Sequence, residues 1–212
     1  MKKFLKSIFE FNKKKSDFDI AFSRLSAEYE IKKLFDCFEN FSENSEIRFV
    51  GGCIRKILNN ETFYDIDLAT NTIPDETIHI LKKNNIRYIK TGIDHGTVTA
   101  IINKKKFEIT SLRKDINTDG RHAKVEFSRD WYEDAKRRDF SINSIYADNE
   151  GNLYDPFNGK EHLKKGLIKF IGDPDKRIKE DFLRILRYIR FFIGYSLTDH
   201  ETEVIKSIKK NI

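Results

Sequence analysis

Apolar side chains recur at helical spacing in the first part of the chain. Between residues 18 and 42 they fall every three or four positions, separated by polar residues: Phe22, Leu25, Ile31, Leu34, Phe35 and Phe38. Such a stripe predicts helices that bury one face against the rest of the fold. Residues 1–17 are basic and aromatic, and a loose amphipathic arm is expected there.

Short apolar runs follow, and they predict strands. The expected strands cover residues 47–50, 64–69, 97–102, 107–112, 153–154 and 168–170. The polar residues 103–106 separate two of these runs and predict a hairpin. Helices are expected over residues 53–59 and from Pro74 to about Asn84, since proline suits the first turn of a helix.

The second half of the chain is predicted to be mostly helical. Residues 115–124 are polar, contain Gly120 and show no periodicity, so we expect a mobile loop. Further helices are predicted over residues 131–147 and 159–165, from a cap at Asp173 or Asp175 to Phe192, and from Asp199 onward.

These elements predict an α+β fold. We expect an N-terminal arm and helix over residues 1–45, and then a head domain over residues 46–148. The head is expected to hold a mixed β-sheet flanked by helices. Residues 149–212 are predicted to form a helical neck.

Composition narrows the class of partner. The chain of 212 residues can bury one solid core, and its net charge of +6 favours a polyanionic partner. Cys37 and Cys53 offer neither metal-ligand spacing nor a disulfide framework, which is typical of a reducing compartment. No apolar run is long enough for a membrane span, so we expect a cytoplasmic protein with no membrane partner.

Two short motifs carry candidate chemistry. Gly51 and Gly52 follow an apolar run and open a predicted helix, where backbone N–H groups can receive a phosphate. Asp65 and Asp67 lie one residue apart in the next predicted strand, so both carboxylates should point from the same face. Their repulsion would be relieved by a divalent cation such as Mg²⁺. Either motif alone is common in plain turns or on strand edges; together they predict phosphoryl or nucleotidyl transfer.

Two later motifs extend this pattern and give it a family resemblance. They are Arg137-Arg138-Asp139-Phe140-Ser141-Ile142-Asn143 and Glu180-Asp181-Phe182-Leu183-Arg184-Ile185-Leu186-Arg187. With the glycine and aspartate motifs, the chain resembles the nucleotidyltransferase superfamily that includes DNA polymerase β. Within it, residues 47 to about 195 resemble the class II tRNA nucleotidyltransferases (CCA-adding enzymes) and bacterial poly(A) polymerases.

The resemblance implies a reaction and a catalytic set. CMP and AMP would pass from CTP and ATP to the 3′ end of tRNA, with Mg²⁺ as cofactor and pyrophosphate leaving. Asp65 and Asp67 would be the metal ligands. Glu108 is the candidate third carboxylate, although a solvent-facing strand glutamate is an equal alternative.

The resemblance also implies nucleotide-binding residues. Gly51, Gly52 and Arg55 match positions near the triphosphate, while Lys56 stands where the family usually has an aspartate. Arg138 would contact phosphate and Asp139 the sugar hydroxyl; the alternative is an Arg–Asp salt bridge that fixes a helix start.

A third set of expected residues lies on the long predicted helix. Asp181, Arg184, Arg187 and Arg190 are three residues apart and would form a stripe along one side. By resemblance, Asp181 and Arg184 would read the base of CTP or ATP, with Glu180 orienting them. The alternative is an i,i+3 salt bridge on an exposed helix. His95, between glycines, is expected to be a structural turn residue rather than a catalytic base.

Several activities stay open at this level. The same motifs fit an A-adding, CC-adding or poly(A) polymerase, or an RNA-binding relic that has lost catalysis. CC-only members typically lack a loop comparable to residues 115–124, so this segment favours CCA addition. The family normally continues into a helical body and tail, absent here. The chain is therefore expected to be a fragment, a minimal enzyme, or half of a split enzyme with a separate C-terminal tRNA-binding chain.

Overall fold

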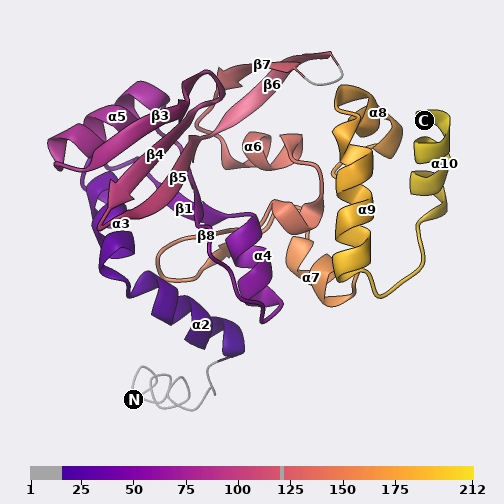
Figure 1. Cartoon of the computed structure of the whole chain (residues 1–212), viewed down its shortest axis with the longest axis horizontal. Coiled ribbons are helices and arrows are strands. Elements are labelled where there is room, and N and C mark those ends of the chain that lie inside the picture. Colours follow the sequence, from indigo (N-terminus) through magenta and orange to yellow (C-terminus); the bar gives the residue numbers. More distant parts are fainter. Residues whose placement is uncertain (1–15, 120–121) are drawn as a thin grey trace, which may run out of the picture.

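The computed structural model describes residues 16–119 and 122–212 and is built around one mixed sheet (Figure 1). Its strand order is β3-β4-β5-β2-β1-β8-β9. The strands are β1 (Ile47–Val50), β2 (Asp67–Thr70), β3 (Arg87–Gly92), β4 (Thr97–Ile102), β5 (Lys105–Ser111), β8 (Tyr146–Ala147) and β9 (Leu153–Tyr154). Strands β2 and β5 run parallel, and all the other neighbours are antiparallel.

Four helices pack around this sheet: two lie within the apolar stripe, and two are the helices predicted from residues 53 and 74. They are α2 (Asp17–Ser26), α3 (Tyr29–Glu39), α4 (Gly52–Leu58) and α5 (Pro74–Lys83). Ser16 caps α2 by accepting a hydrogen bond from the Asp19 backbone N–H. The six apolar residues of the predicted stripe are all buried, so the core interpretation is confirmed. The predicted arm at the N-terminus lies mostly outside the described residues.

The predicted hairpin is confirmed, with a tighter turn than expected. Asn103 and Lys104 both have positive φ, at 48° and 69°, and they form the two-residue turn between β4 and β5. Because the turn takes only two residues, β5 begins at Lys105 rather than at residue 107.

The prediction of a mobile loop over residues 115–124 is wrong. Strands β6 (Arg113–Asp119) and β7 (His122–Phe127) form a separate antiparallel hairpin, with Arg113 opposite Phe127. Strand β6 is mostly polar and shows no alternation, whereas the sequence of β7 alternates polar residues with Ala123, Val125 and Phe127. The predicted loop ended at residue 124 and so divided this period-2 pattern.

The helix predicted over residues 131–147 is half right. Helix α6 (Trp131–Arg137) ends where Arg138 turns to extended backbone, with φ −67° and ψ 161°. A short 3₁₀ turn follows over Ser141–Asn143, and the chain then enters β8. The extended stretch predicted over residues 168–170 is reduced to an isolated bridge between Phe170 and Phe140.

The C-terminal helices lie beside the sheet (Figure 1). They are α7 (Gly159–Lys164), α8 (Pro174–Glu180), α9 (Leu183–Tyr195) and α10 (Thr202–Lys210). Asp173 caps α8 by accepting a hydrogen bond from the Lys176 N–H, so the first of the two predicted caps, Asp173 rather than Asp175, is confirmed. The single long helix to Phe192 is wrong: Asp181 breaks it with φ −157° and ψ 106°, and its carboxylate accepts from the Leu183 N–H instead. The last helix begins at Thr202 rather than at Asp199.

Two main groups of buried apolar residues stabilise the fold. One lies between the sheet and α2–α5, and includes Leu34, Phe49 and Leu68. The other joins α7–α10 to Phe140 and Ile142. The predicted boundary between head and neck after residue 148 stays a prediction. None of the helices in the described ranges is long and apolar enough to cross a membrane.

Candidate active site

Two of the predicted carboxylates lie opposite each other on neighbouring strands. Asp67 is the first residue of β2, and it pairs in parallel register with Glu108 of β5. Burial and then the charges of Glu108 and Asp65 raise the pKa of Asp67, while Arg138 and Arg55 act against the shift. The two carboxylates therefore repel each other and Asp67 is poorly neutralised.

Asp65 occupies a different position from the one expected. It precedes β2, which begins at Asp67, so the prediction that both aspartates share one strand face is wrong in its local structure. Asp65 is exposed, yet its charge still acts on Asp67. The segment before β2 is not a strand, but it places the Asp65 carboxylate near enough to Asp67 for the two charges to repel.

This carboxylate group suits a hard divalent cation chemically. Asp65, Asp67 and Glu108 supply oxygen donors and excess negative charge, the donor set that Mg²⁺ prefers. Among residues 16–119 and 122–212, however, no three His, Cys, Asp or Glu side chains are already arranged around one metal position. We infer that Asp65 and Asp67, with Glu108 beside them, would hold the ion after side-chain adjustment.

The diglycine turn brings backbone close to Asp67. Gly51 has φ +68° and ψ −116°, a conformation that favours glycine, and its N–H donates to the Ile145 carbonyl. A Cβ on Gly52 would lie 3.8 Å from Asp67 Oδ2. Cys53 is a buried core residue with an unreactive thiol, because burial raises the pKa of that thiol to about 12.

Arg55 is held in place by residues from two other elements, helix α9 and the 3₁₀ turn Ser141–Asn143. It lies on α4, is only 8% exposed, and its guanidinium stacks on the rings of Phe191 and Tyr195 of α9, at 4.8 and 5.1 Å. It also donates to Asn143 Oδ1. Asn143 in turn donates to Asp139 Oδ1 at 3.0 Å. Sequence reasoning did not assign Asn143 a role, although it stands in the quoted Arg-Arg-Asp motif.

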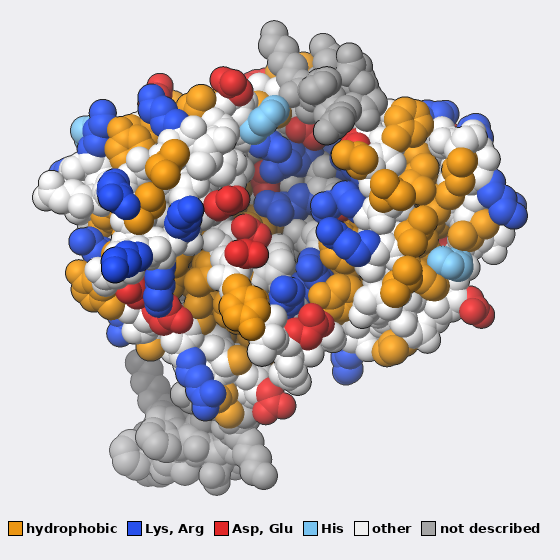
Figure 2. Space-filling model, viewed as in Figure 1, with side chains coloured by type: hydrophobic (Ala, Val, Ile, Leu, Met, Phe, Trp, Pro, Cys, Tyr) orange, Lys and Arg blue, Asp and Glu red, His pale blue; other side chains and the backbone are white. Residues whose placement is uncertain are grey.

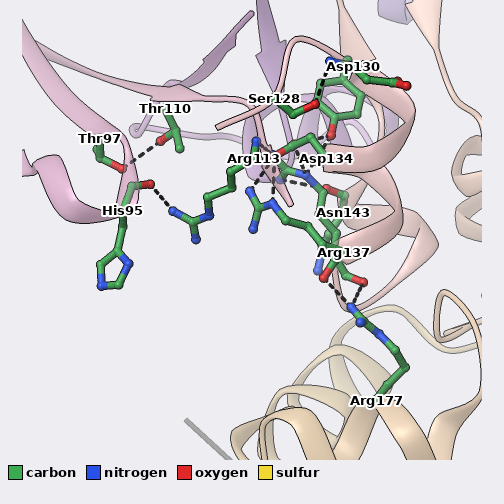
Figure 3. A network of polar contacts seen from close by, with 12 residues as sticks. His95, Thr97, Thr110, Arg113, Ser128, Asp130, Asp134, Arg137, Asn143 and Arg177 are labelled. Atoms are coloured by element: carbon green, nitrogen blue, oxygen red, sulfur yellow. Dashed lines mark hydrogen bonds and ion pairs between the residues drawn. The ribbon is translucent and has the colours of Figure 1, made fainter. Parts of the chain in front are cut away.

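Arg138 is oriented by a buried network around Asp134, and Figure 3 shows Asp134 and Arg137 of this network. Its Nε and Nη2 donate to Asp134 Oδ2 at 3.2 and 3.0 Å, and Nε also donates to Tyr146 Oη at 2.9 Å. Tyr146 donates to the same carboxylate at 2.6 Å, and Arg137 ion-pairs with its other oxygen. Burial disfavours the charge of Asp134, but Arg138 and Arg137 hold its pKa well below the usual range.

Asp134 is therefore a site residue that the sequence analysis missed. It is 1% exposed and forms ion pairs with two arginines at once. An aspartate three and four residues before an Arg-Arg pair on a predicted helix was the available signal.

Asp139 pairs with a residue of the C-terminal helices. Its Oδ2 accepts from Arg187 Nε at 2.6 Å, and its Oδ1 accepts from the Phe140 N–H at 2.9 Å. The expected alternative, a salt bridge between Arg138 and Asp139, is wrong because each residue has another partner. The Asp139–Arg187 pair instead links the motif after α6 to α9.

The two residues expected to read the base do not lie on one helix, as the predicted stripe required. Asp181 lies in the break between α8 and α9, whereas Arg184 lies in the first turn of α9. Arg184 is 8% exposed, and its Nη1 donates to Glu180 Oε2 at 2.6 Å and to the Arg177 carbonyl at 2.7 Å. The predicted bridge partner Asp181 is thus replaced by Glu180, which orients Arg184 as expected.

Most of the predicted residues line two adjoining cavities. One, of about 590 Å³, is bordered by Asp139, Asp181, Arg184 and Arg187. The other, of about 390 Å³, is bordered by Gly51, Gly52, Arg55, Asp67, Arg187 and Arg190. Both also share the walls Thr97, Arg113, Arg137, Arg138 and Asn143.

The cavities open in a basic hollow of the surface. Figure 2 shows Lys and Arg side chains gathered there, between the sheet and the C-terminal helices. Asp65 and Glu108 lie outside the lining of both cavities. His95 borders the larger one at the end of a 3₁₀ turn (Ile93–His95), where its backbone carbonyl accepts from Arg113.

Comparison with known sequences identifies relatives. Residues 47–169 match the family model described as the poly A polymerase head domain. A human protein named CCA tRNA nucleotidyltransferase 1, mitochondrial, is 45% identical over 184 residues, which cover 85% of this chain and 42% of that protein. The CCA-adding enzyme of Oceanobacillus iheyensis is 39% identical over 175 residues, which cover 81% and 43% of the two chains.

A solved structure has the same arrangement of elements. The Bacillus stearothermophilus CCA-adding enzyme, in complex with CTP, superposes with a TM-score of 0.72 at 31% identity. The match covers 87% of this chain and 44% of that one. The chain thus spans about two fifths of the length of the curated relatives it matches.

Proposed function

Because the chain belongs to the poly A polymerase head-domain family, a group of nucleotidyltransferases, we propose that it adds nucleotides to the 3′ end of tRNA without a template. The donors are CTP and ATP, the transferred groups are CMP and AMP, and the product end is CCA. The names of the human and Oceanobacillus relatives support this choice of reaction.

One observation carries the proposal. Asp67, the Gly51–Gly52 turn and Arg138 line one cavity, with Glu108 paired to Asp67 on the neighbouring strand, and this cavity adjoins the one lined by Asp181 and Arg184. An acidic centre beside a phosphate-binding turn, joined to a pocket with acceptor and donor groups, accommodates a whole nucleoside triphosphate. Cavities of this size are typical for such ligands.

The chain's own residues divide the work of the reaction. Family members generally use divalent metal ions, and a Mg²⁺ ion held by Asp65 and Asp67 would lower the pKa of the attacking 3′-hydroxyl and neutralise the leaving group. Arg55 and Arg138 would bind the triphosphate, since rigid guanidinium groups pair well with phosphate oxygens. Asn143 and Asp134 would keep these two arginines in place.

Base selection is assigned to the break between α8 and α9. The Asp181 Oδ1 atom accepts from Leu183 N–H, which leaves Oδ2 to accept from an amino group. CTP and ATP both carry an exocyclic amino group, whereas UTP lacks it. Arg184 keeps its Nη2 for a base acceptor, because its bond to the Arg137 carbonyl is long, at 3.5 Å. Asp139 would accept from the sugar hydroxyl beside Arg187.

Alternative activities can be separated by the choice of acceptor. The β6–β7 hairpin occupies the segment that CC-only members typically lack, so we favour CCA addition over CC addition. The test uses tRNA ending before the CCA sequence, after C and after CC, each with CTP, ATP or both. Complete CCA on every acceptor supports the proposal. CC alone, A alone or a long A tail would replace it with the corresponding alternative, and no product would favour an RNA-binding relic. A cytoplasmic location and a separate C-terminal chain stay predictions.

A further inference from the structure

Arg113 lies between the two cavities and belongs to none of the motifs. It is the first residue of β6, at the base of the β6–β7 hairpin, and it lines both cavities. Neither the sequence pattern nor the reaction described above gives it a role. Its position makes it a neighbour of any ligand that extends from Gly51 to Asp181.

The hydrogen-bonding capacity of Arg113 is only partly used. One terminal nitrogen donates to the His95 carbonyl, and Figure 3 shows the side chain extending toward His95 and away from Asp134. Its Nε atom is buried and has no hydrogen-bond partner. Among the described side chains, Arg113 has no ion-pair partner, because Asp134 pairs with Arg137 and Arg138 instead. A buried unpaired donor of this kind is costly unless a ligand satisfies it.

The carboxylates near Arg113 only partly balance the positive charge around it. The buried carboxylate of Asp134 is already engaged by the guanidinium groups of Arg137 and Arg138, and the Arg113 side chain lies near these two positive charges. Burial and then the charge of Arg137 lower the pKa of Arg113 to about 10, and Asp115 and Asp134 do not offset this. An anion in the cavity would supply the missing charge and an acceptor for Nε. A neutral base or sugar would supply only the acceptor.

We propose that Arg113 binds a phosphate group of the incoming nucleoside triphosphate, at the passage between the two cavities. The inference rests on the proposed function, which places the triphosphate near Gly51 and the base near Asp181. It adds the hairpin base to the nucleotide-binding surface. It also explains why an arginine with an unpaired donor stands where both cavities meet.

The test measures binding by calorimetry of the full chain, in magnesium, to inorganic tripolyphosphate, CTP and cytidine. Arg113→Gln removes the charge but keeps a donor for the His95 carbonyl. Lys114→Gln is the matched control, because Lys114 is the next residue on β6, points to the opposite side and pairs with exposed Glu126. Arg113→Lys keeps the charge without the planar fork. Near-ultraviolet circular dichroism checks that each variant is folded.

Arg113→Gln should weaken the binding of tripolyphosphate and of CTP by roughly tenfold or more, which is the loss of affinity expected for one charge-assisted hydrogen bond. Cytidine binding and the Lys114→Gln variant should stay within about twofold of wild type on the same scale. The affinity of Arg113→Lys for tripolyphosphate should lie between those of wild type and Arg113→Gln. If Arg113→Gln does not fold, a loss of affinity in Arg113→Lys serves as the test. Unchanged tripolyphosphate binding by Arg113→Gln would overturn the inference, as would a loss confined to CTP. Failure of the wild-type chain to bind CTP at all would instead overturn the proposed function together with it.

Discussion

Asp67 and Glu108 face each other across parallel strands β2 and β5, at the edge of a basic cavity. Two carboxylates at paired positions repel, and burial raises the pKa of Asp67 further. Such repulsion costs folding free energy, so the pair indicates that these charges serve a function.

The first prediction concerns Asp67 and stability. A carboxyl group whose pKa is raised by folding destabilises the native state once it ionises, so its cost appears as pH rises through the folded pKa. Asp67→Asn should therefore melt at the same or a higher temperature than wild type at pH 7 to 8. The two curves should converge in acid. Thermal unfolding followed by circular dichroism measures this, and a clear loss of stability at neutral pH would show that Asp67 is structurally paired.

The second prediction concerns base selection by Asp181. Asp181→Asn keeps a side-chain oxygen for the Leu183 N–H, so the helix break should survive. Exchanging the other oxygen for an amide should reduce the preference for CTP and ATP over UTP and GTP by roughly tenfold, since a base-edge contact is worth about 1–3 kcal/mol. Competition between nucleotides in one incorporation assay gives the ratio. An unchanged ratio would leave Asp181 as a helix cap only.

The third prediction concerns the buried network around Asp134. Asp134→Asn leaves two arginines under-neutralised and should destabilise the fold by about 3–5 kcal/mol at neutral pH. Because folding lowers the pKa of Asp134, its contribution is present above the ordinary aspartate value of about 3.9 and is lost as the pH falls below it. The gap between wild type and variant in urea unfolding should therefore narrow in acid.

A milder variant tests the same network. Tyr146→Phe removes one hydroxyl, which donates to Asp134 and accepts from Arg138. It should cost about 1–3 kcal/mol of stability and leave the ion pairs intact. If Tyr146→Phe were as damaging as Asp134→Asn, packing around Tyr146 rather than charge would dominate.

The parts of the site that are close in sequence were predictable. The glycine turn and the strand that carries Asp67 follow from local pattern, although that strand begins at Asp67 rather than at residue 64. Register also mattered: a parallel neighbour was needed to bring Glu108 opposite Asp67, and the spacing alone left a solvent-facing glutamate equally open.

The parts that depend on tertiary contacts were not predictable. The Asp139–Arg187 pair joins residues 48 positions apart, and it replaces a local Arg138–Asp139 bridge that the sequence made plausible. The helix break at Asp181 is similar, because a capping aspartate looks like any polar residue within a helical stripe. The orphaned Nε of Arg113 is visible only once the two cavities are assembled.

Nucleotide incorporation by wild type and Asp67→Asn tests the account most directly. Both chains are incubated with tRNA lacking its CCA end, CTP and ATP, in Mg²⁺ or in EDTA, with exposed Glu43→Gln as the control for charge removal. Wild type and Glu43→Gln should build CCA in Mg²⁺ alone, while Asp67→Asn loses roughly three orders of magnitude in rate. Incorporation by Asp67→Asn at the wild-type rate, or by wild type in EDTA, would contradict the account.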